Sequence, residues 1–139
     1  MMLEPGERST SVEEQSRKIS DLLLRDNQTI LVAEVGGELV GYVAAFGGDF
    51  RRSRHCAYIV TGVLRAFSGQ GIGTELLSEL EQWAGRNGIH RLELTVMTHN
   101  ERALRLYRRM GYEIEGRKRD SLLVNGSYVD EYYMGKLLE

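Results

Sequence analysis

Three glycines at alternate positions carry the clearest chemical signal in this sequence: Gly69, Gly71 and Gly73. A β-prone run, Ala57 to Val63, leads into them, and an amphipathic helical pattern follows. Glycine backbones can turn several N–H groups toward one point, and the first turn of a helix adds unpaired N–H groups and a partial positive charge. The order of strand, glycine turn and helix therefore predicts an anion site that suits a phosphate or a pyrophosphate.

The spacing of these glycines differs from that of two common phosphate-binding loops. The dinucleotide fingerprint requires Gly-x-Gly-x-x-Gly, and the nucleoside-triphosphate loop requires Gly-Lys-Ser/Thr. This sequence has Gly-x-Gly-x-Gly at 69–73 and no Gly-Lys-Ser/Thr. An ordinary glycine-rich turn between a strand and a helix would explain the pattern equally well, so a second motif is needed to decide.

The second motif runs from Asn100 to Tyr112. Asn100 fits an N-cap and Gly111 fits a C-terminal stop, so the spacing predicts a short helix over 100–110. Its inner face combines apolar side chains with the hydroxyl of Tyr107, while four arginines point outward. Core packing alone would explain Tyr107.

Length, charge and cysteine usage narrow the class of protein. A chain of 139 residues suits one domain with its own core, and residues 1–10 are expected to be a loose lead-in. The net charge of -2, from intermixed acidic and basic residues, gives no broad basic surface for nucleic acid. The single cysteine, Cys56, excludes an intramolecular disulfide, and we find no signal-like start or apolar run of membrane-spanning length. We expect a small-molecule partner, no nucleic acid, no membrane, no metal and a cytoplasmic location.

The remaining pattern alternates strands and helices. We expect an α/β (α+β) fold: a mixed, mostly antiparallel twisted sheet with a central parallel βαβ unit and helices on both faces. Gly36-Gly37 and Asn125-Gly126 are typical hairpin turns. The expected helices are 11–26, 72–86 and 100–110, and the expected strands are 29–35, 38–46, 57–63, 92–97, 113–123 and 127–138.

The two motifs lie one strand apart, and together they resemble the GNAT superfamily of acetyl-CoA-dependent N-acetyltransferases. The resemblance covers residues 28–138. It implies that Val63 and the backbone of 70–74 bind the pantetheine and pyrophosphate of acetyl-CoA. It also implies that Asn100 hydrogen-bonds to the cofactor and that Tyr107 lies beside its sulfur. The cofactor-binding residues implied in this way are Val63, Ser68, Gly69, Gln70, Gly71, Ile72, Gly73, Thr74, Asn100 and Tyr107.

Two segments resemble one subgroup of the family more closely, and two features differ from the family pattern. The segments 115–134 and Arg51-Arg52-Ser53 are similar to small bacterial members that acetylate free amino acids or related amines. Ser68 stands where the family often has Gln or Arg, which removes one side-chain contact to phosphate but leaves the backbone contacts. The family also begins with a strand and a helix ahead of the one expected at 11–26, for which this chain has no room. We expect that strand and helix to be trimmed, with a sheet edge left exposed or covered by a partner, such as the second copy in a homodimer.

Transfer of an acetyl group from a thioester to an amine has three chemical needs. The amine must be neutral, the carbonyl oxygen must be able to carry negative charge, and the leaving thiolate must receive a proton. A backbone N–H near Val63, on a strand splayed from its neighbour, could polarise the carbonyl, and Tyr107 could protonate the sulfur as a general acid. Direct attack in a ternary complex requires no covalent intermediate. Cys56 has no recognisable partner that would make it a nucleophile.

The base is not evident. Many members of the family use a carboxylate on the strand before the glycine turn, and none lies between Ala57 and Val63. At pH 7 a lysine-like amine costs about 4.6 kcal/mol to deprotonate, and an α-amine costs about 1.4 kcal/mol. We therefore expect an acceptor with a free α-amino group, whose carboxylate could meet Arg51, Arg52 or Arg54. The candidates for a base or a substrate-binding residue are Glu34, His55, Glu93, Asp130 and Glu131.

Other functions fit part of the same pattern. A protein N-terminal or ribosomal-protein acetyltransferase would need a groove open to an extended peptide. A non-catalytic acyl-CoA sensor would bind the cofactor and transfer nothing. A Rossmann-type nucleotide binder is opposed by the glycine spacing and by the strong terminal hairpin.

Overall fold

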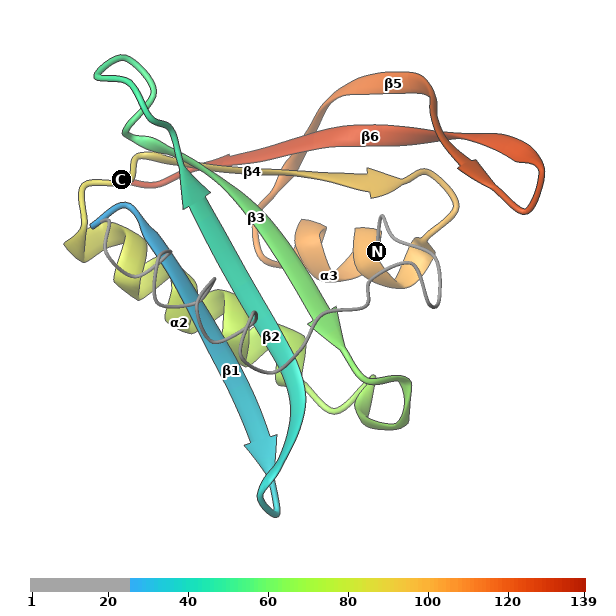
Figure 1. Cartoon of the computed structure of the whole chain (residues 1–139), viewed down its shortest axis with the longest axis horizontal. Coiled ribbons are helices and arrows are strands. Elements are labelled where there is room, and N and C mark those ends of the chain that lie inside the picture. Colours follow the sequence, from blue (N-terminus) through green and yellow to red (C-terminus); the bar gives the residue numbers. More distant parts are fainter. Residues whose placement is uncertain (1–25) are drawn as a thin grey trace, which may run out of the picture.

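The computed structural model describes residues 26–139, which form a six-stranded sheet with two helices packed on one of its faces (Figure 1). The strands lie in the order β1-β2-β3-β4-β6-β5. Within the described residues only β3 and β4 pair in parallel. The expected mixed, mostly antiparallel sheet with a central βαβ unit is confirmed. The elements are β1 (Gln28–Val35), β2 (Glu38–Gly47), β3 (Cys56–Val63), the short 3-10 helix η1 (Arg65–Phe67), α2 (Ile72–Arg86), β4 (Arg91–Met97), α3 (Glu101–Arg109), β5 (Glu113–Val124) and β6 (Ser127–Leu137).

Some expectations fall on residues outside the described part of the chain. The lead-in over 1–10 and nearly all of the helix expected over 11–26 lie there, so a helix on the second face of the sheet is not part of this description. The expected loss of a first strand and helix also concerns residues ahead of β1. In the described sheet β1 is one of the two edge strands. Neither α2 nor α3 is long and apolar enough to cross a membrane.

Two tight turns set the register of the outer hairpins. Gly36 and Gly37 have φ angles of 59° and 84°, and Asn125 and Gly126 have φ angles of 50° and 78°. Positive φ at both central residues is the mark of the turn that matches the twist of two antiparallel strands. Both hairpins predicted from the sequence are confirmed.

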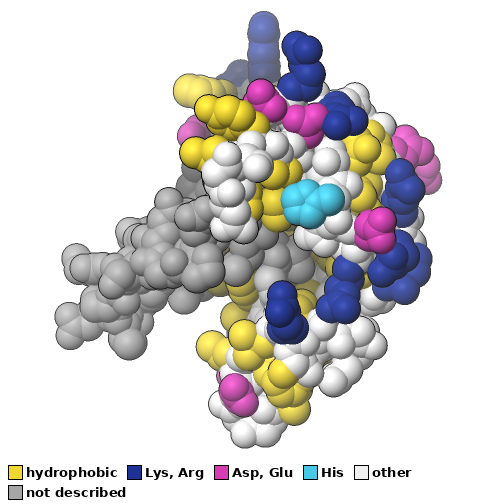
Figure 2. Space-filling view, turned by 90° about the vertical axis from the view of Figure 1, so that its right-hand side faces the viewer, with side chains coloured by type: hydrophobic (Ala, Val, Ile, Leu, Met, Phe, Trp, Pro, Cys, Tyr) yellow, Lys and Arg dark blue, Asp and Glu magenta, His cyan; other side chains and the backbone are white. Residues whose placement is uncertain are grey.

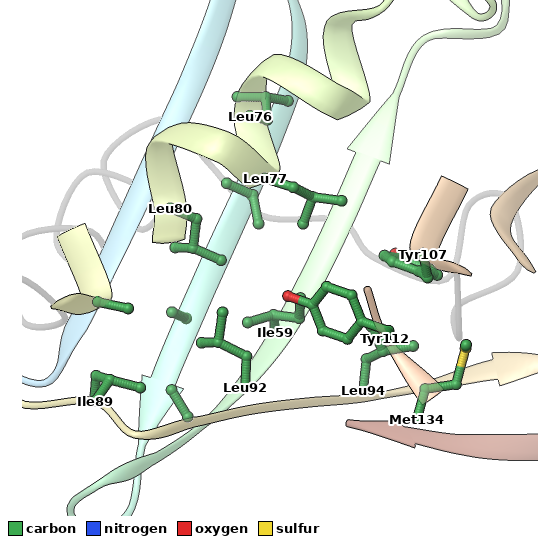
Figure 3. Packing of buried hydrophobic residues seen from close by; sticks show 14 of the residues in the cluster. Ile59, Leu76, Leu77, Leu80, Ile89, Leu92, Leu94, Tyr107, Tyr112 and Met134 are labelled. Atoms are coloured by element: carbon green, nitrogen blue, oxygen red, sulfur yellow. The ribbon is translucent and has the colours of Figure 1, made fainter. Parts of the chain in front are cut away.

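One hydrophobic core lies between the sheet and the two helices (Figure 3). Leu77 and Leu80 of α2 have no exposed surface. Leu92 and Leu94 of β4 face the same core, while the residues between them face the other side of the sheet. Burial of each such leucine contributes about 1.5–3 kcal/mol. The core therefore fixes α2 on the sheet and sets where its N-terminus lies.

The pairing between β3 and β4 is short. It joins Cys56–Tyr58 to Arg91–Glu93 and then stops. β3 stays paired with β2 as far as Val63, and β4 stays paired with β6 as far as Met97. Because each strand follows its other neighbour, the two diverge, and α3 lies beside the opening (Figure 1). We call this opening the strand gap.

Candidate active site

The strand gap contains a pocket of about 100 Å³. Its walls come from residues 58–61 of β3, residues 95–97 of β4, the inner face of α3, and β5 and β6. Asn100, Tyr107 and Glu131 all line it. Three side chains that the sequence singled out, two from α3 and its N-cap and one from β6, therefore meet at one place.

The backbone amides of Thr61 and Val63 point into the strand gap. The Leu64 N–H donates to the Val40 carbonyl at 2.8 Å, so these two residues are a hydrogen-bonded pair of the β2–β3 ladder. Bonded and non-bonded pairs alternate along an antiparallel ladder, so Val63 and Thr61 direct their N–H groups away from β2. β4 has already diverged at this point. Among the described residues no strand pairs with these N–H groups, which leaves them able to polarise a carbonyl oxygen.

The glycine turn leaves its amides free. Gly69 and Gly71 have φ angles of 79° and 82°, which residues with side chains rarely adopt. Gly71 is the N-cap of α2 and gives the helix no side-chain hydrogen bond. Within residues 26–139 no backbone acceptor is found for the amides of 69–74. The segment therefore combines free donors with the positive end of the α2 dipole, as an anion site requires.

Gly73 differs from the other two glycines in its backbone conformation. Gly73 has no positive φ, and a Cβ at this position would lie 2.9 Å from Cδ2 of Leu106 on α3. Its missing side chain leaves room for the tip of the Leu106 side chain. Of the three glycines, Gly69 and Gly71 thus have the positive φ that favours glycine, and the contact of Gly73 with a cofactor stays a prediction.

Arg102 is a feature of this site that the sequence pattern did not reveal. Its Nη1 donates to Ser68 Oγ at 2.6 Å, and Ser68 Oγ donates to the Arg65 carbonyl at 2.7 Å. α3 thus brings a guanidinium to the glycine turn although residue 68 is a serine. Figure 2, which looks onto the side of the molecule at the right of Figure 1, shows Lys and Arg side chains gathered on part of that face. No sequence signal pairs Arg102 with Ser68, because the contact depends on how α3 packs.

Asn100 begins α3 as predicted. Its Oδ1 accepts a hydrogen bond from the Ala103 N–H at 3.2 Å. This bond satisfies one of the free donors of the helix N-terminus. Its Nδ2 group has no hydrogen-bond partner among the residues described and remains free to donate to a ligand.

Tyr107 is buried at the strand gap, with 8% of its surface exposed. Its ring meets the ring of Tyr112 edge-on, with centroids 5.7 Å apart (Figure 3). Burial raises the pKa of the Tyr107 hydroxyl, and the neighbouring Thr61 hydroxyl opposes the shift in part. Thr61 Oγ1 is itself buried and unpartnered within residues 26–139. At neutral pH the Tyr107 hydroxyl therefore keeps its proton.

A larger pocket of about 410 Å³ lies on the sheet face opposite α2 and α3, and we call it the outer pocket. Arg91, Glu93 and Thr95 point into it because they alternate with the core-facing residues of β4. Tyr58, Thr95 and Glu131 line both the outer pocket and the strand gap. The Tyr58 and Thr95 hydroxyls hydrogen-bond to each other at 2.7 Å. The two spaces therefore meet at these three side chains.

Two of the five candidates for a base or a substrate-binding residue lie in the outer pocket. Glu131 is 3% exposed, lines both pockets and accepts a hydrogen bond from the Ser121 hydroxyl. Glu93 lines the outer pocket and is ion-paired with Arg91 at 2.9 Å. Glu131 is the one with no cation against it among the described ion pairs.

The other three candidates line neither pocket. Asp130 accepts from the Asp120 N–H at 2.7 Å and from Arg117 Nε at 2.6 Å, and these contacts hold the pKa of its carboxyl below the ordinary value. A carboxylate stabilised in this way is a weak base. His55 is exposed at the start of β3, where the two strands are still paired. Glu34 is exposed on the edge strand β1.

The arginines between β2 and β3 lie outside both pockets. Arg51 and Arg52 are exposed, and Arg54 is ion-paired with Asp26 at 2.7 Å. This loop joins the end of β2 to the start of β3, whereas the strand gap opens toward the end of β3. The structure therefore gives no support to the expectation that these arginines meet an acceptor.

Known proteins share both the sequence motifs and the fold. The model of the Acetyltransferase (GNAT) family matches residues 2–112. L-amino acid N-acetyltransferase AaaT of Escherichia coli (strain K12) is 32% identical over 111 residues, which are 77% of this chain and 67% of that protein. These matches confirm the resemblance that the two motifs indicated.

Solved structures agree. An acetyltransferase of the GNAT family from Streptococcus pneumoniae has a TM-score of 0.89 and 32% identity, covering 92% of this chain and 77% of that chain. Ribosomal-protein-alanine N-acetyltransferase from Brucella melitensis has a TM-score of 0.85 and 28% identity, covering 95% and 82%. YncA from Salmonella typhimurium, solved with its cofactor acetyl-CoA, has a TM-score of 0.88 at 23% identity over 96% and 77% and so shares the fold. Fold and site define an acyltransferase. The chain belongs to the acetyltransferase (GNAT) family.

The reactivity of Cys56 tests the surroundings of the β3–β4 pairing. Burial, followed by the Glu93 carboxylate, raises the pKa of this thiol from 9.0 to about 11, and Arg91 opposes the shift. Only the thiolate reacts, so iodoacetamide at pH 8 should modify Cys56 about 100-fold more slowly than a thiol of ordinary pKa. Because the chain has a single cysteine, the rate reports on this thiol alone.

The pH dependence of that rate separates the pKa from simple shielding. The wild-type rate should rise with an inflection near pH 11. Glu93→Gln should lower the inflection because it removes a negative charge next to the thiolate. Glu79→Gln, at an exposed position of α2, is the control and should leave it unchanged. A wild-type inflection at the ordinary value would contradict this account.

Proposed function

We propose that this protein transfers the acetyl group of acetyl-CoA to the primary amine of a small molecule in the cytoplasm, by direct attack in a ternary complex. One arrangement carries the proposal. The Tyr107 hydroxyl lies at the strand gap, and the N–H groups of Thr61 and Val63 point away from β2 toward it. Arg102, on the same helix as Tyr107, contacts Ser68 beside the amides of 69–74. Relatives named N-acetyltransferases and a neighbouring structure with acetyl-CoA support it.

The proposed cofactor site follows the start of α2 and the free edge of β3. The amides of 69–74 bind the pyrophosphate, and the side of Val63 that faces the strand gap pairs with the amides of the pantetheine arm. Asn100 donates from Nδ2 to the cofactor. Acetyl-CoA supplies the activated thioester, and the residues of the strand gap act on it.

Those residues meet two of the three chemical needs. The N–H groups of Thr61 and Val63 stabilise negative charge on the carbonyl oxygen while the amine attacks. The C–N bond forms, the C–S bond breaks, and Tyr107 gives its proton to the departing sulfur. The nitrogen loses a proton to water, and Tyr107 regains one from water. The raised pKa of Tyr107 supports this role, because the hydroxyl stays protonated until the sulfur leaves.

Tyr107→Phe tests the proton donor. The ring is kept and only the hydroxyl is lost, so kcat should fall by a factor of about 10² to 10⁴ while the Kd for acetyl-CoA changes little. Tyr112→Phe is the matched control: its hydroxyl is also buried but has no hydrogen-bond partner in the described residues, so activity should stay near wild type. Release of free thiol measures both. If Tyr107→Phe turns over at the wild-type rate, its hydroxyl is only structural.

Arg102 should add a side-chain charge to the pyrophosphate site. Arg102→Ala should raise the Kd for CoA about 10-fold, which corresponds to about 1.4 kcal/mol, and should leave the KM for S-acetylpantetheine, which has no pyrophosphate, unchanged. Arg105→Ala removes another exposed arginine of α3 and is the control. Adding Ser68→Arg to Arg102→Ala should restore part of the affinity. An unchanged Kd for CoA in Arg102→Ala would argue against this role.

The acceptor that fits best is a free amino acid or a related amine. The relative AaaT is named an L-amino acid N-acetyltransferase. Deprotonation of an α-amine also needs a weaker base than deprotonation of a lysine-like amine. This suits a β3 strand that carries no carboxylate. A second candidate is the N-terminus of a protein, because one neighbouring structure is a ribosomal-protein-alanine N-acetyltransferase.

An assay of a panel of amines with acetyl-CoA, in which the release of free thiol is measured, decides the function. We expect the highest kcat/KM for free amino acids. The highest kcat/KM for peptides with a free N-terminus would favour the second candidate. A kcat/KM for polyamines or lysine side chains tenfold above that of every α-amine would overturn both candidates. If acetyl-CoA binds and no amine is acetylated, the remaining alternative is that the protein is a non-catalytic acyl-CoA sensor.

A further inference from the structure

The outer pocket has the size of a small acceptor and leads to the strand gap. Its volume of about 410 Å³ falls in the range of small-molecule sites. Tyr58, Thr95 and Glu131 form its inner end, because they also line the strand gap. An amine in the outer pocket can thus reach the gap from the face opposite α2 and α3.

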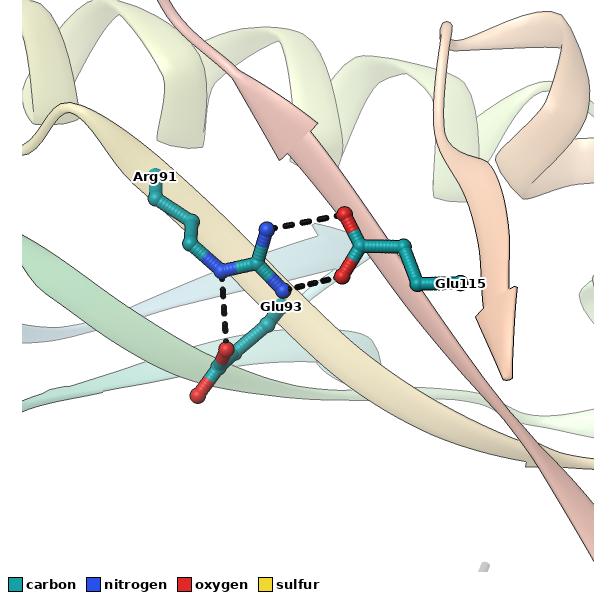
Figure 4. A network of polar contacts seen from close by, with 3 residues as sticks. All are labelled: Arg91, Glu93 and Glu115. Atoms are coloured by element: carbon teal, nitrogen blue, oxygen red, sulfur yellow. Dashed lines mark hydrogen bonds and ion pairs between the residues drawn. The ribbon is translucent and has the colours of Figure 1, made fainter. Parts of the chain in front are cut away.

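Four charged side chains line the outer pocket, and two of them are already engaged. Arg91 donates from Nε to Glu93 at 2.9 Å, and from its terminal nitrogens to Glu115 at 2.9 and 2.5 Å (Figure 4). These three side chains carry one positive and two negative charges. Their network therefore does not attract the carboxylate of an acceptor. The two remaining charges are Lys118 and Glu131.

Glu131 and Lys118 are complementary to a molecule that carries both charges. Glu131 is buried at the inner end of the outer pocket, with the Ser121 hydroxyl as its donor and no described cation paired with it. A buried carboxylate without a cation is costly, and an ammonium would offset that cost. Lys118 is directly opposite Glu131 in the β5–β6 register and is exposed, with no ion pair to the residues described.

A break in the β5–β6 ladder holds this pair in place. The register shifts after Lys118, and Asp120 has a φ angle of 48°. The Asp120 N–H donates to Asp130 at 2.7 Å, and the next residue, Ser121, reaches Glu131. Bulges of this kind re-aim side chains. This one directs Ser121 onto Glu131.

We propose that the outer pocket is the acceptor site and selects free α-amino acids, with Glu131 binding the α-ammonium and Lys118 binding the carboxylate. The proposal rests on the acetyl transfer proposed above. In an α-amino acid one carbon separates the two charged groups. Side chains directly opposite on neighbouring strands have Cβ atoms about 4.5–5.5 Å apart, so Lys118 and Glu131 can converge on one such molecule.

The chemistry balances with Glu131 as the base. Glu131 takes one proton from the ammonium, which frees the nitrogen lone pair. The nitrogen then forms its bond to the carbonyl carbon, the C–S bond breaks, and Tyr107 protonates the sulfur. The nitrogen loses its second proton to water, Glu131 releases its proton to water, and Tyr107 regains one from water. The products are an N-acetylamino acid, CoA with a free thiol, and one proton.

Lys118→Ala tests the carboxylate contact. The probes are the twenty standard L-amino acids and their carboxamides, which keep the amine and lack the negative charge. Lys118→Ala should raise KM for the acids at least 10-fold with little change in kcat, and should leave KM for the carboxamides unchanged. Arg119→Ala is the control at the adjacent exposed position. An equal shift for acids and carboxamides, or a shift in Arg52→Ala instead of Lys118→Ala, would overturn the assignment.

Glu131→Gln tests the ammonium contact. Gln keeps the size and can still accept from the Ser121 hydroxyl, and an unchanged Kd for acetyl-CoA shows that the variant is folded. Its kcat/KM for amino acids should fall at least 10-fold at pH 7 and recover as the pH rises, because solvent then deprotonates the amine. A pH profile parallel to wild type would overturn the role of Glu131. Other titratable or charged groups line the two pockets with Glu131, and the wild type and the Glu131→Gln variant share them. They are Tyr58, Arg91, Glu93, Tyr107, Lys118 and Tyr133.

The wild-type result separates the two proposals. If amino acids and their carboxamides are acetylated with equal kcat/KM, acetyl transfer stands and the selection of amino acids fails. If no amine is acetylated although acetyl-CoA binds, the proposed function itself fails, and the selection of amino acids fails with it.

Discussion

The fold depends on one conflict between neighbouring strands. β3 follows β2 and β4 follows β6, and after three shared residues they can no longer follow each other. Backbone N–H and C=O groups are obligatory hydrogen-bonding groups, so a break in the middle of a sheet is unusual. Here it leaves donors on β3 free at the place where Tyr107 and Asn100 of α3 arrive. Under the proposed function, the reactive centre is therefore made first by backbone geometry and only then by side chains.

The sheet also separates two electrostatic environments. On the side of α2 and α3, the glycine turn and Arg102 favour anions. On the other side, the outer pocket contains a buried carboxylate and an Arg91 that two glutamates have already engaged. The two sides meet where Tyr58 and Thr95 hydrogen-bond to each other. Under the two proposals, a phosphate-bearing donor and an ammonium-bearing acceptor would thereby reach one opening from opposite faces of the sheet.

Local rules account for what the sequence could predict. Gly36-Gly37 and Asn125-Gly126 have strong turn preferences, and the joint spacing of the glycine turn and Asn100 is enough to indicate the family. The rest depends on tertiary packing. The choice among the candidate bases needed the register of β6 against β4 and β5, which places Glu131 at the strand gap and its neighbour Asp130 beside Arg117. The contact of Arg102 with Ser68 needed the approach of α3 to α2, which the glycine pattern does not encode.

Under the proposed function, the uncapped start of α2 would link the stability of the folded protein to the supply of acetyl-CoA. Within the described residues, the amides of 69–74 have no hydrogen-bond acceptor, and no side chain caps α2. A molecule that binds only the folded state stabilises it by mass action, by about 2.7 kcal/mol at a concentration 100 times its Kd. Under the proposed function, a cell rich in acetyl-CoA would keep the first turn of α2 closed and protected from proteases. A cell depleted of it would lose activity twice, through an empty site and through faster turnover of the enzyme itself.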